Sequence, residues 1–143
     1  MAGGEAAVTA HRIIAAGIGC RAGCPGDEIA GLVRAALEEA ALDETARRAV
    51  QLAAPMRKRN EAGVAEAARR LALPLQFVDD SALMAAQDRV QTRSARVEAA
   101  VGVASVAEAA ALAAAGPGST LLLPRRSTPR ATCALAISGE VSA

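Results

Sequence analysis

Aromatic side chains are almost absent from this sequence, with Phe77 as the only aromatic residue in 143. Domains that bind single-stranded nucleic acid stack bases on aromatic side chains, and this chain lacks such a platform. Its formal net charge is only +1, so no strong basic field attracts nucleic acid or an anionic membrane. We therefore expect neither nucleic acid nor a membrane as a partner.

Long apolar runs are also missing, since none reaches the roughly 18 residues that span a bilayer. The stretch HRIIAAGIGC loosely resembles a lipoprotein signal, but its apolar part is too short, and a first β-strand is the better interpretation. Three cysteines, an odd number, argue against a disulfide framework. These absences favour a cytoplasmic protein.

The chain is rich in apolar residues, which make up 52% of the sequence. Its length suffices for one domain with a hydrophobic core. No internal repeat or linker divides it. We expect a single domain over residues 1–143, in which residues 1–10 form a loose lead.

Short apolar segments alternate with segments of helical periodicity. The predicted strands cover residues 12–19, 48–55, 73–78, 119–124 and 131–138. The predicted helices cover residues 25–42, a segment capped by Asn60, residues 79–87 behind an Asp cap, and two pieces within 97–116. Gly102 separates those two pieces, Ser105 and Glu108 have the spacing of a capping box, and Gly116 is the expected C-cap.

This alternation predicts the α/β class, as a three-layer α/β/α sandwich around a mostly parallel five-stranded sheet. The loop before the last strand is short, so we expect the last strand to be antiparallel and to pair with the preceding strand at one edge.

Ligands of open α/β sheets bind outside the carboxyl ends of the parallel strands. Three of the four loops predicted there are basic, and the connection before the last helix adds further arginines. Arginine suits bidentate recognition of carboxylate or phosphate, and helix N-termini add N–H donors. The sequence therefore predicts a ligand with several anionic groups, and the alternative is that these side chains are merely solvated. The cations are Arg21, Arg57, Lys58, Arg59, Arg93, Arg96, Arg125, Arg126 and Arg130.

The stretch GIGCRAGCPGDE, residues 17–28, allows several readings. Gly17, Gly19 and Gly23 form a weak variant of the dinucleotide fingerprint, and the basic residues 57–59 suit the 2′-phosphate of NADP. The acid expected after the second strand is missing, however, and no G-K-[ST] sequence forms a P-loop.

Cysteine chemistry is a second reading of the same stretch. Cys20 and Cys24 have only His11 and Cys133 as further soft ligands, and their spacing matches no familiar zinc site. Cys20 is a conceivable nucleophile, because a helix N-terminus and Arg21 would lower its pKa. Acids at helix starts could serve acid–base catalysis but are more typical of caps; they are Asp27, Glu28, Glu61 and Asp79.

Four motifs in register resemble the CobE/CbiG C-terminal family of cobalamin biosynthesis, and most of all its free-standing members. They are GIGCRAG before DEIAGLVRAALEEAAL, then RKRNEAGVAEAARRLALPLQF, SARVEAAVGVASVAEAAALAAAG and LLLPRRSTPRATCALAIS. The resemblance covers about residues 12–138. It departs at Ala22, Gly23 and Cys24, where relatives usually carry a second basic residue and Gly-Thr or Gly-Ser, and the second strand lacks the aspartate often found there.

The resemblance implies a protein that binds a polycarboxylate precorrin or corrinoid intermediate, as a carrier or in lactone opening. We expect neither a cofactor nor a metal. Other cobalamin-biosynthesis enzymes are the expected partners, and an NADP-binding or purely structural partner protein is the alternative. The residues expected at the ligand are Gly19, Cys20, Arg21, Gly23, Lys58, Glu61, Ser94, Arg96, Arg125, Arg126 and Thr132.

Overall fold

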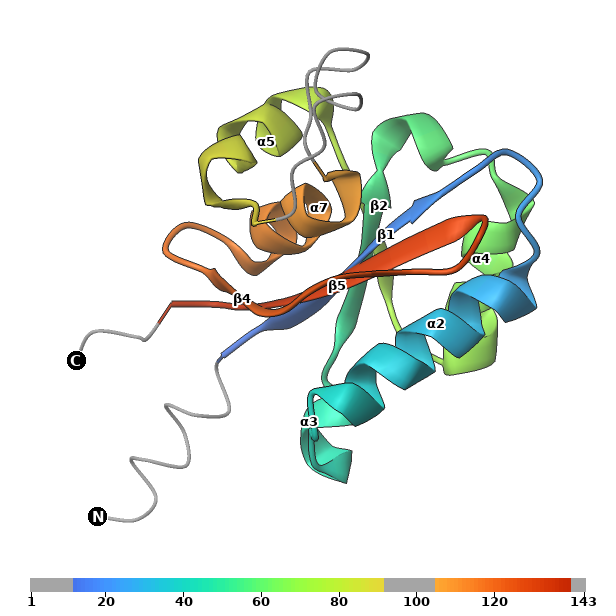
Figure 1. The fold of residues 1–143 in the computed structure, drawn as a ribbon, viewed down its shortest axis with the longest axis horizontal. Helices are drawn as coiled ribbons and strands as arrows, with labels where there is room; N and C mark the ends of the chain where they lie inside the picture. The colour runs from blue at the N-terminus through green and yellow to red at the C-terminus, as the bar shows by residue number, and fades with distance from the viewer. Residues whose placement is uncertain (1–11, 92–104, 140–143) are drawn as a thin grey trace.

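The fold is described by a computed structural model that covers residues 12–91 and 105–139 (Figure 1). The loose lead, the break expected at Gly102 and the helical piece before it lie outside the described residues.

Five strands form one sheet in the order β3-β2-β1-β5-β4. The strands are β1 (Ile14–Cys20), β2 (Gln51–Pro55), β3 (Leu75–Val78), β4 (Thr120–Ser127) and β5 (Ala131–Ile137). β1 pairs with β2, and β2 with β3, in parallel, whereas β5 runs antiparallel to both β1 and β4. The predicted sheet with an antiparallel last strand is confirmed. Because only β5 is reversed, β1 to β4 all end at the same edge.

Helices cover both faces of the sheet, which confirms the three-layer α/β/α architecture (Figure 1). α2 (Gly26–Glu39) and α4 (Ala62–Leu71) pack on one face, and α5 (Asp80–Ala85) and α7 (Val106–Ala115) on the other. No helix in the described ranges is both long enough and apolar enough to cross a membrane.

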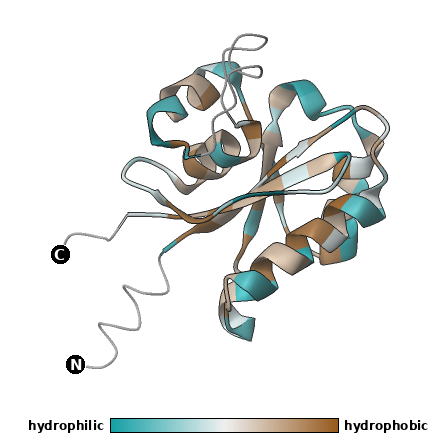
Figure 2. Cartoon of the chain, in the orientation of Figure 1, coloured by the Kyte–Doolittle hydropathy of each residue, from teal (hydrophilic) through white to brown (hydrophobic). Residues whose placement is uncertain are grey.

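Two apolar clusters, one on each face, fill the space between the sheet and the helices. Ala16 and Ile18 of β1 belong to the cluster under α2, and Ala15 to the cluster under α7, as the period-2 alternation of a strand requires. Figure 2 shows hydrophobic residues along the strands and hydrophilic residues on much of the outer helical surface.

Gly17 lets α7 lie directly on β1. A Cβ atom at this position would stand 1.9 Å from the carbonyl oxygen of Ala107 and 2.6 Å from the amide nitrogen of Ala111. The first turn of α7 is thereby held over the carboxyl half of β1. Ser105 caps this helix by accepting a hydrogen bond from the Glu108 N–H at 3.3 Å, as its spacing predicts, and Gly116 ends it with φ of +94°.

Some predicted boundaries are wrong because local capping ends or starts an element elsewhere. Asp43 caps an unpredicted helix, α3 (Glu44–Arg48), so β2 begins at Gln51. α2 ends earlier than expected, at Glu39, and Ala41 after it has φ of +55°. The N-cap of α4 is Glu61 and not Asn60, and the turn before it is a 3-10 helix, η1 (Met56–Lys58). A second 3-10 turn, η2 (Gln87–Arg89), follows α5, whose predicted cap Asp79 accepts the Ala82 N–H at 2.8 Å.

β4 is longer than the sequence suggests. It was expected to end at Pro124, with residues 125–130 as a loop, yet it continues to Ser127. Arg126 pairs with Cys133 and Ser127 with Thr132 across the ladder to β5. Arg125 and Arg126 are therefore strand residues, and the turn between the two strands is short.

Candidate functional site

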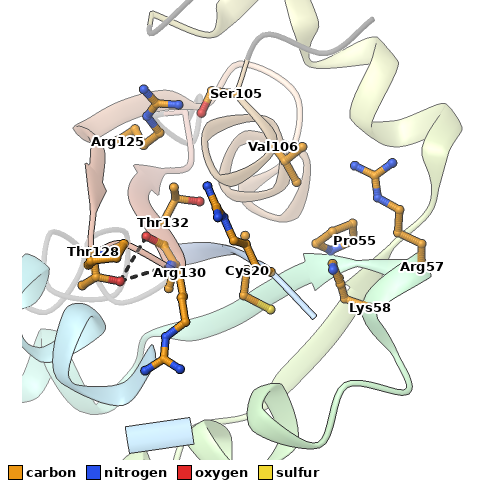
Figure 3. A pocket seen from close by; sticks show the side chains of 14 residues that line it. Cys20, Pro55, Arg57, Lys58, Ser105, Val106, Arg125, Thr128, Arg130 and Thr132 are labelled. Carbon is orange, nitrogen blue, oxygen red and sulfur yellow. Dashed lines mark hydrogen bonds between the residues drawn. The ribbon is translucent and has the colours of Figure 1, made fainter. Parts of the chain in front are cut away.

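A cavity of about 310 Å³ opens at the edge where β1 and β2 end (Figure 3). The ends of β1 and β2, the η1 turn, the start of α7 and the β4–β5 turn form its walls. Its lining residues are Gly19, Cys20, Arg21, Pro55, Arg57, Lys58, Ser105, Val106, Arg125, Thr128, Pro129, Arg130, Ala131 and Thr132. The expected position of the site, outside the carboxyl ends of parallel strands, thus coincides with a real cavity.

The cavity is cationic, because five of its lining residues are arginine or lysine and none of those described is acidic. Arg57 and Lys58 stand on one side in Figure 3, and Arg125 and Arg130 on the opposite side. Four of the five have no side-chain hydrogen bond or ion pair with any other described residue: Arg21, Arg57, Lys58 and Arg125. Their charges are open to an anion in the cavity.

Arg130 is the exception, because Glu28 of α2 holds its guanidinium. The Arg130 Nε and Nη2 atoms lie 2.8 and 2.7 Å from Glu28 Oε1. Glu28 Oε2 accepts the Arg130 backbone N–H at 3.1 Å and the Thr128 hydroxyl. The Thr128 hydrogen bond, followed by those from Arg130, holds the pKa of the Glu28 carboxyl below its ordinary value.

Glu61 joins the two loops that follow β1 and β2. Its Oε2 accepts the Gly23 N–H at 3.0 Å, and Gly23 has φ of +79°, a backbone conformation that glycine adopts without strain. Neither residue lines the cavity. The two residues fix the loop that presents Arg21.

Glu108 is wholly buried behind the cavity, at 0% exposure. Its Oε1 accepts the Gln91 N–H at 2.7 Å, and its Oε2 accepts the Arg125 N–H at 2.8 Å. Burying a carboxylate costs free energy unless hydrogen bonds compensate it, and these two N–H groups contribute to that compensation. Glu108 therefore ties α7 to β4 at the residue that carries one of the open cations.

At the floor of the cavity, Gly19 makes room for Thr132. A Cβ atom on Gly19 would lie 2.6 Å from the Thr132 hydroxyl oxygen, across the antiparallel pair of β1 and β5. A side chain here would displace the hydroxyl or fill the cavity.

The cavity brings together six of the residues expected at the ligand: Gly19, Cys20, Arg21, Lys58, Arg125 and Thr132. Gly23 and Glu61 lie behind it, and Ser94 and Arg96 lie outside the described residues. Arg126 is directed elsewhere: its Nε lies 2.9 Å from Glu39 Oε1. Neighbouring side chains of a strand point to opposite faces, and a register shift of β4 between Leu123 and Arg126 places Arg126, and not Arg125, on the face of α2.

The sequence pointed to Arg57 and Arg130 only as members of the basic set, and it did not place Ser105, Val106 or Thr128 at the site. The cap at Ser105 marks where α7 begins. Nothing in its spacing shows that this end reaches the cavity, because that depends on the close packing at Gly17.

Cys20 does not have the pKa expected of an activated nucleophile. It is the last residue of β1, and burial raises the pKa of its thiol, with Lys58 opposing this effect and Glu61 adding to it. Cys24 and Cys133 are buried, and burial raises the pKa of Cys133 to about 12. No group of three or more potential metal ligands occurs among residues 12–91 and 105–139.

Comparison with known proteins gives consistent matches. Residues 14–136 match the family described as "Cobalamin synthesis G C-terminus". The protein CobE of a Sinorhizobium species is 34% identical over 121 residues, which are 84% of this chain and 77% of that one.

Two crystal structures share the fold. CobE, described as a protein from the cobalamin (vitamin B12) biosynthetic pathway, aligns with a TM-score of 0.79 and 34% identity over 92% of this chain and 94% of its own. The cobalamin biosynthesis protein chiG of Agrobacterium tumefaciens aligns with a TM-score of 0.69 and 37% identity over 90% of this chain and 100% of its own.

Proposed function

The chain belongs to the cobalamin synthesis G C-terminal family and is a protein of cobalamin biosynthesis, and from this premise we propose that it binds a polycarboxylate corrin intermediate in the cationic cavity. The observation that carries the proposal is the set of four open cations around a cavity with no acidic lining residue among those described. Corrin intermediates carry acetate and propionate arms. Charge-assisted hydrogen bonds from arginine and lysine are the strongest contacts that such arms can make.

The size of the cavity indicates how such a ligand would sit. At about 310 Å³ it lies at the lower end of the roughly 300–1,000 Å³ typical of cavities that enclose a drug-sized molecule. A corrin macrocycle with its arms is larger than such a molecule. We therefore infer that one edge of the ring and its carboxylate arms enter, and that the remainder stays outside, accessible to another enzyme of the pathway.

Binding without chemistry has more support than lactone opening. Hydrolysis needs a general base or a nucleophile within reach of the ligand, and the described lining contains neither a carboxylate nor a histidine. Cys20 is the one thiol in the lining, and burial raises its pKa, which disfavours the thiolate that would act as a nucleophile.

A titration of the protein with hydrogenobyrinic acid, followed by absorbance, tests the proposal. We expect saturable binding with Kd in the range of tens of micromolar or tighter, and binding weaker by tenfold or more for Arg125→Gln, because one charge-assisted contact contributes about 1.5–3 kcal/mol. Arg126→Gln is the matched control: it removes the neighbouring arginine of β4, whose side chain is held by Glu39. Absence of binding, or equal effects of the two substitutions, would contradict the proposal.

A further inference from the structure

We propose that Glu28 is a positioning residue of this site: it fixes the β4–β5 turn as one wall of the cavity and keeps Arg130 against that wall, so that the ligand is held by the four open cations and not by Arg130. This inference rests on the proposed function and adds to it the identity of the cations that the ligand meets.

The contacts of Glu28 show that its carboxylate is fully engaged. Four donor groups converge on it: the Nε and Nη2 atoms of Arg130, the Arg130 backbone N–H, and the Thr128 hydroxyl. Its side chain is only 16% exposed, although that of Arg130 is 53% exposed. A ligand carboxylate that takes Arg130 must first displace this carboxylate and leave it partly buried without its partner, which is costly.

The turn that Glu28 holds also anchors the opposite loop. The Thr128 N–H bonds to the Ala131 carbonyl at 2.9 Å, and the Ala131 N–H bonds to the Thr128 hydroxyl at 3.1 Å. The Arg130 carbonyl accepts the Arg21 N–H at 2.9 Å. The contacts of Glu28 therefore extend through the turn to the loop that carries Arg21, which is one of the open cations.

A second carboxylate on the same helix provides a control. Glu39, in the last turn of α2, pairs with Arg126 of β4, so it too joins α2 to the β4–β5 hairpin. Both of its partners are about half exposed, at 41% for Arg126 and 46% for Glu39, and neither lines the cavity. Substitution of Glu39 removes the same kind of ion pair away from the site.

The first experiment measures hydrogenobyrinic acid binding at several salt concentrations. We expect Arg130→Gln to weaken binding less than Arg125→Gln, for which the loss should be tenfold or more, because the Arg130 guanidinium is already held by Glu28. Glu28→Gln retains an acceptor for the turn but releases the charge of Arg130, so its affinity should fall more steeply with salt than that of the wild type. The double variant Glu28→Gln/Arg130→Gln should return to the wild-type salt dependence, and Glu39→Gln should not depart from it.

Equal losses for Arg130→Gln and Arg125→Gln, or an unchanged salt dependence in Glu28→Gln, would overturn the inference while leaving the proposed function intact. Absence of wild-type binding would instead overturn the proposed function.

The second experiment needs no ligand and tests whether Glu28 fixes the β4–β5 turn. We expect Glu28→Ala to speed hydrogen exchange at the Arg21 and Ala131 amides by about tenfold, since each loses part of the turn that holds its acceptor. Glu39→Ala should leave both rates unchanged. Equal exchange rates in Glu28→Ala and the wild type would overturn the inference. Glu28→Ser, whose short side chain cannot reach the turn, serves for the same comparison if the alanine variant does not fold.

Discussion

The two faces of the sheet are packed by different kinds of side chain. Under α2 and α4 the cluster contains branched residues such as Ile18, Ile29 and Leu52. Under α7 it is built mostly from alanines, including Ala15 and Ala110, and the glycine at position 17 allows backbone contact. Small side chains let a helix come closer to a strand, so α7 lies nearer to β1 than ordinary side-chain packing permits.

This difference determines how each helix reaches the site. The start of α7 lines the cavity directly, through Ser105 and Val106. α2 also begins near this edge, but among its residues only Glu28 has a hydrogen bond to the β4–β5 turn, through its side chain. Close packing on β1 places the start of α7 at the cavity. The larger side chains under α2 keep that helix further away, and only the long side chain of Glu28 reaches the β4–β5 turn.

The largest expected effect comes from adding one carbon atom to the close-packed face. Gly17→Ala places a Cβ 1.9 Å from a backbone oxygen of α7, which cannot move without displacing the helix. We expect a loss of about 3 kcal/mol or more in the free energy of unfolding, at the upper end of overpacking effects, measured by urea denaturation.

Gly31→Ala is the control for Gly17→Ala. No atom lies within 4 Å of a Cβ at this helical position, so alanine should stabilise the protein by about 0.5–1 kcal/mol. Equal effects at the two glycines would show that α7 does not lie on β1 as closely as described.

Removing one carbon atom from the other face should cost less. Ile29 of α2 is 1% exposed and packs into the cluster between α2 and the sheet, and Ile29→Val should lower the free energy of unfolding by about 0.5–1.5 kcal/mol, as measured by the same denaturation. A loss as large as that of Gly17→Ala would remove the distinction between the two faces.

The sheet was predictable because short apolar strands alternate with amphipathic helices, and this pattern fixes the layers. The short loop before the last strand also gave the antiparallel direction of β5. The boundaries at Asp43, Glu61 and Ser127 were not predictable in the same way. The first depends on the cap that Asp43 provides, the second on the 3-10 turn before α4, after which Glu61 bonds to Gly23 and not to its own helix, and the third on ladder pairing with β5.

The cationic character of the site followed from where basic residues stand relative to strand ends. The sequence could not tell which cations are open. Arg125 and Arg126 are adjacent and identical in type, and the register shift of β4 between Leu123 and Arg126 decides which of them faces the cavity and which reaches Glu39. Likewise, Glu28 reads as an ordinary acid at a helix start, and its part in the site depends on a turn about a hundred residues away.

The smallest expected effect is on the pH dependence of stability, which should reveal the contribution of the Glu28 contact between α2 and the β4–β5 turn. The pKa of Glu28 is lowered in the folded protein, so its contribution is complete above the ordinary value of 4.5 and is lost as the pH falls through the lowered value. The groups that face it are Thr128, Arg130 and Cys24. The stability difference between wild type and Glu28→Gln, followed by thermal unfolding, should be constant from pH 7 to about 5 and shrink in stronger acid. A difference that grows in acid would mean that the turn does not stabilise the charged form of Glu28.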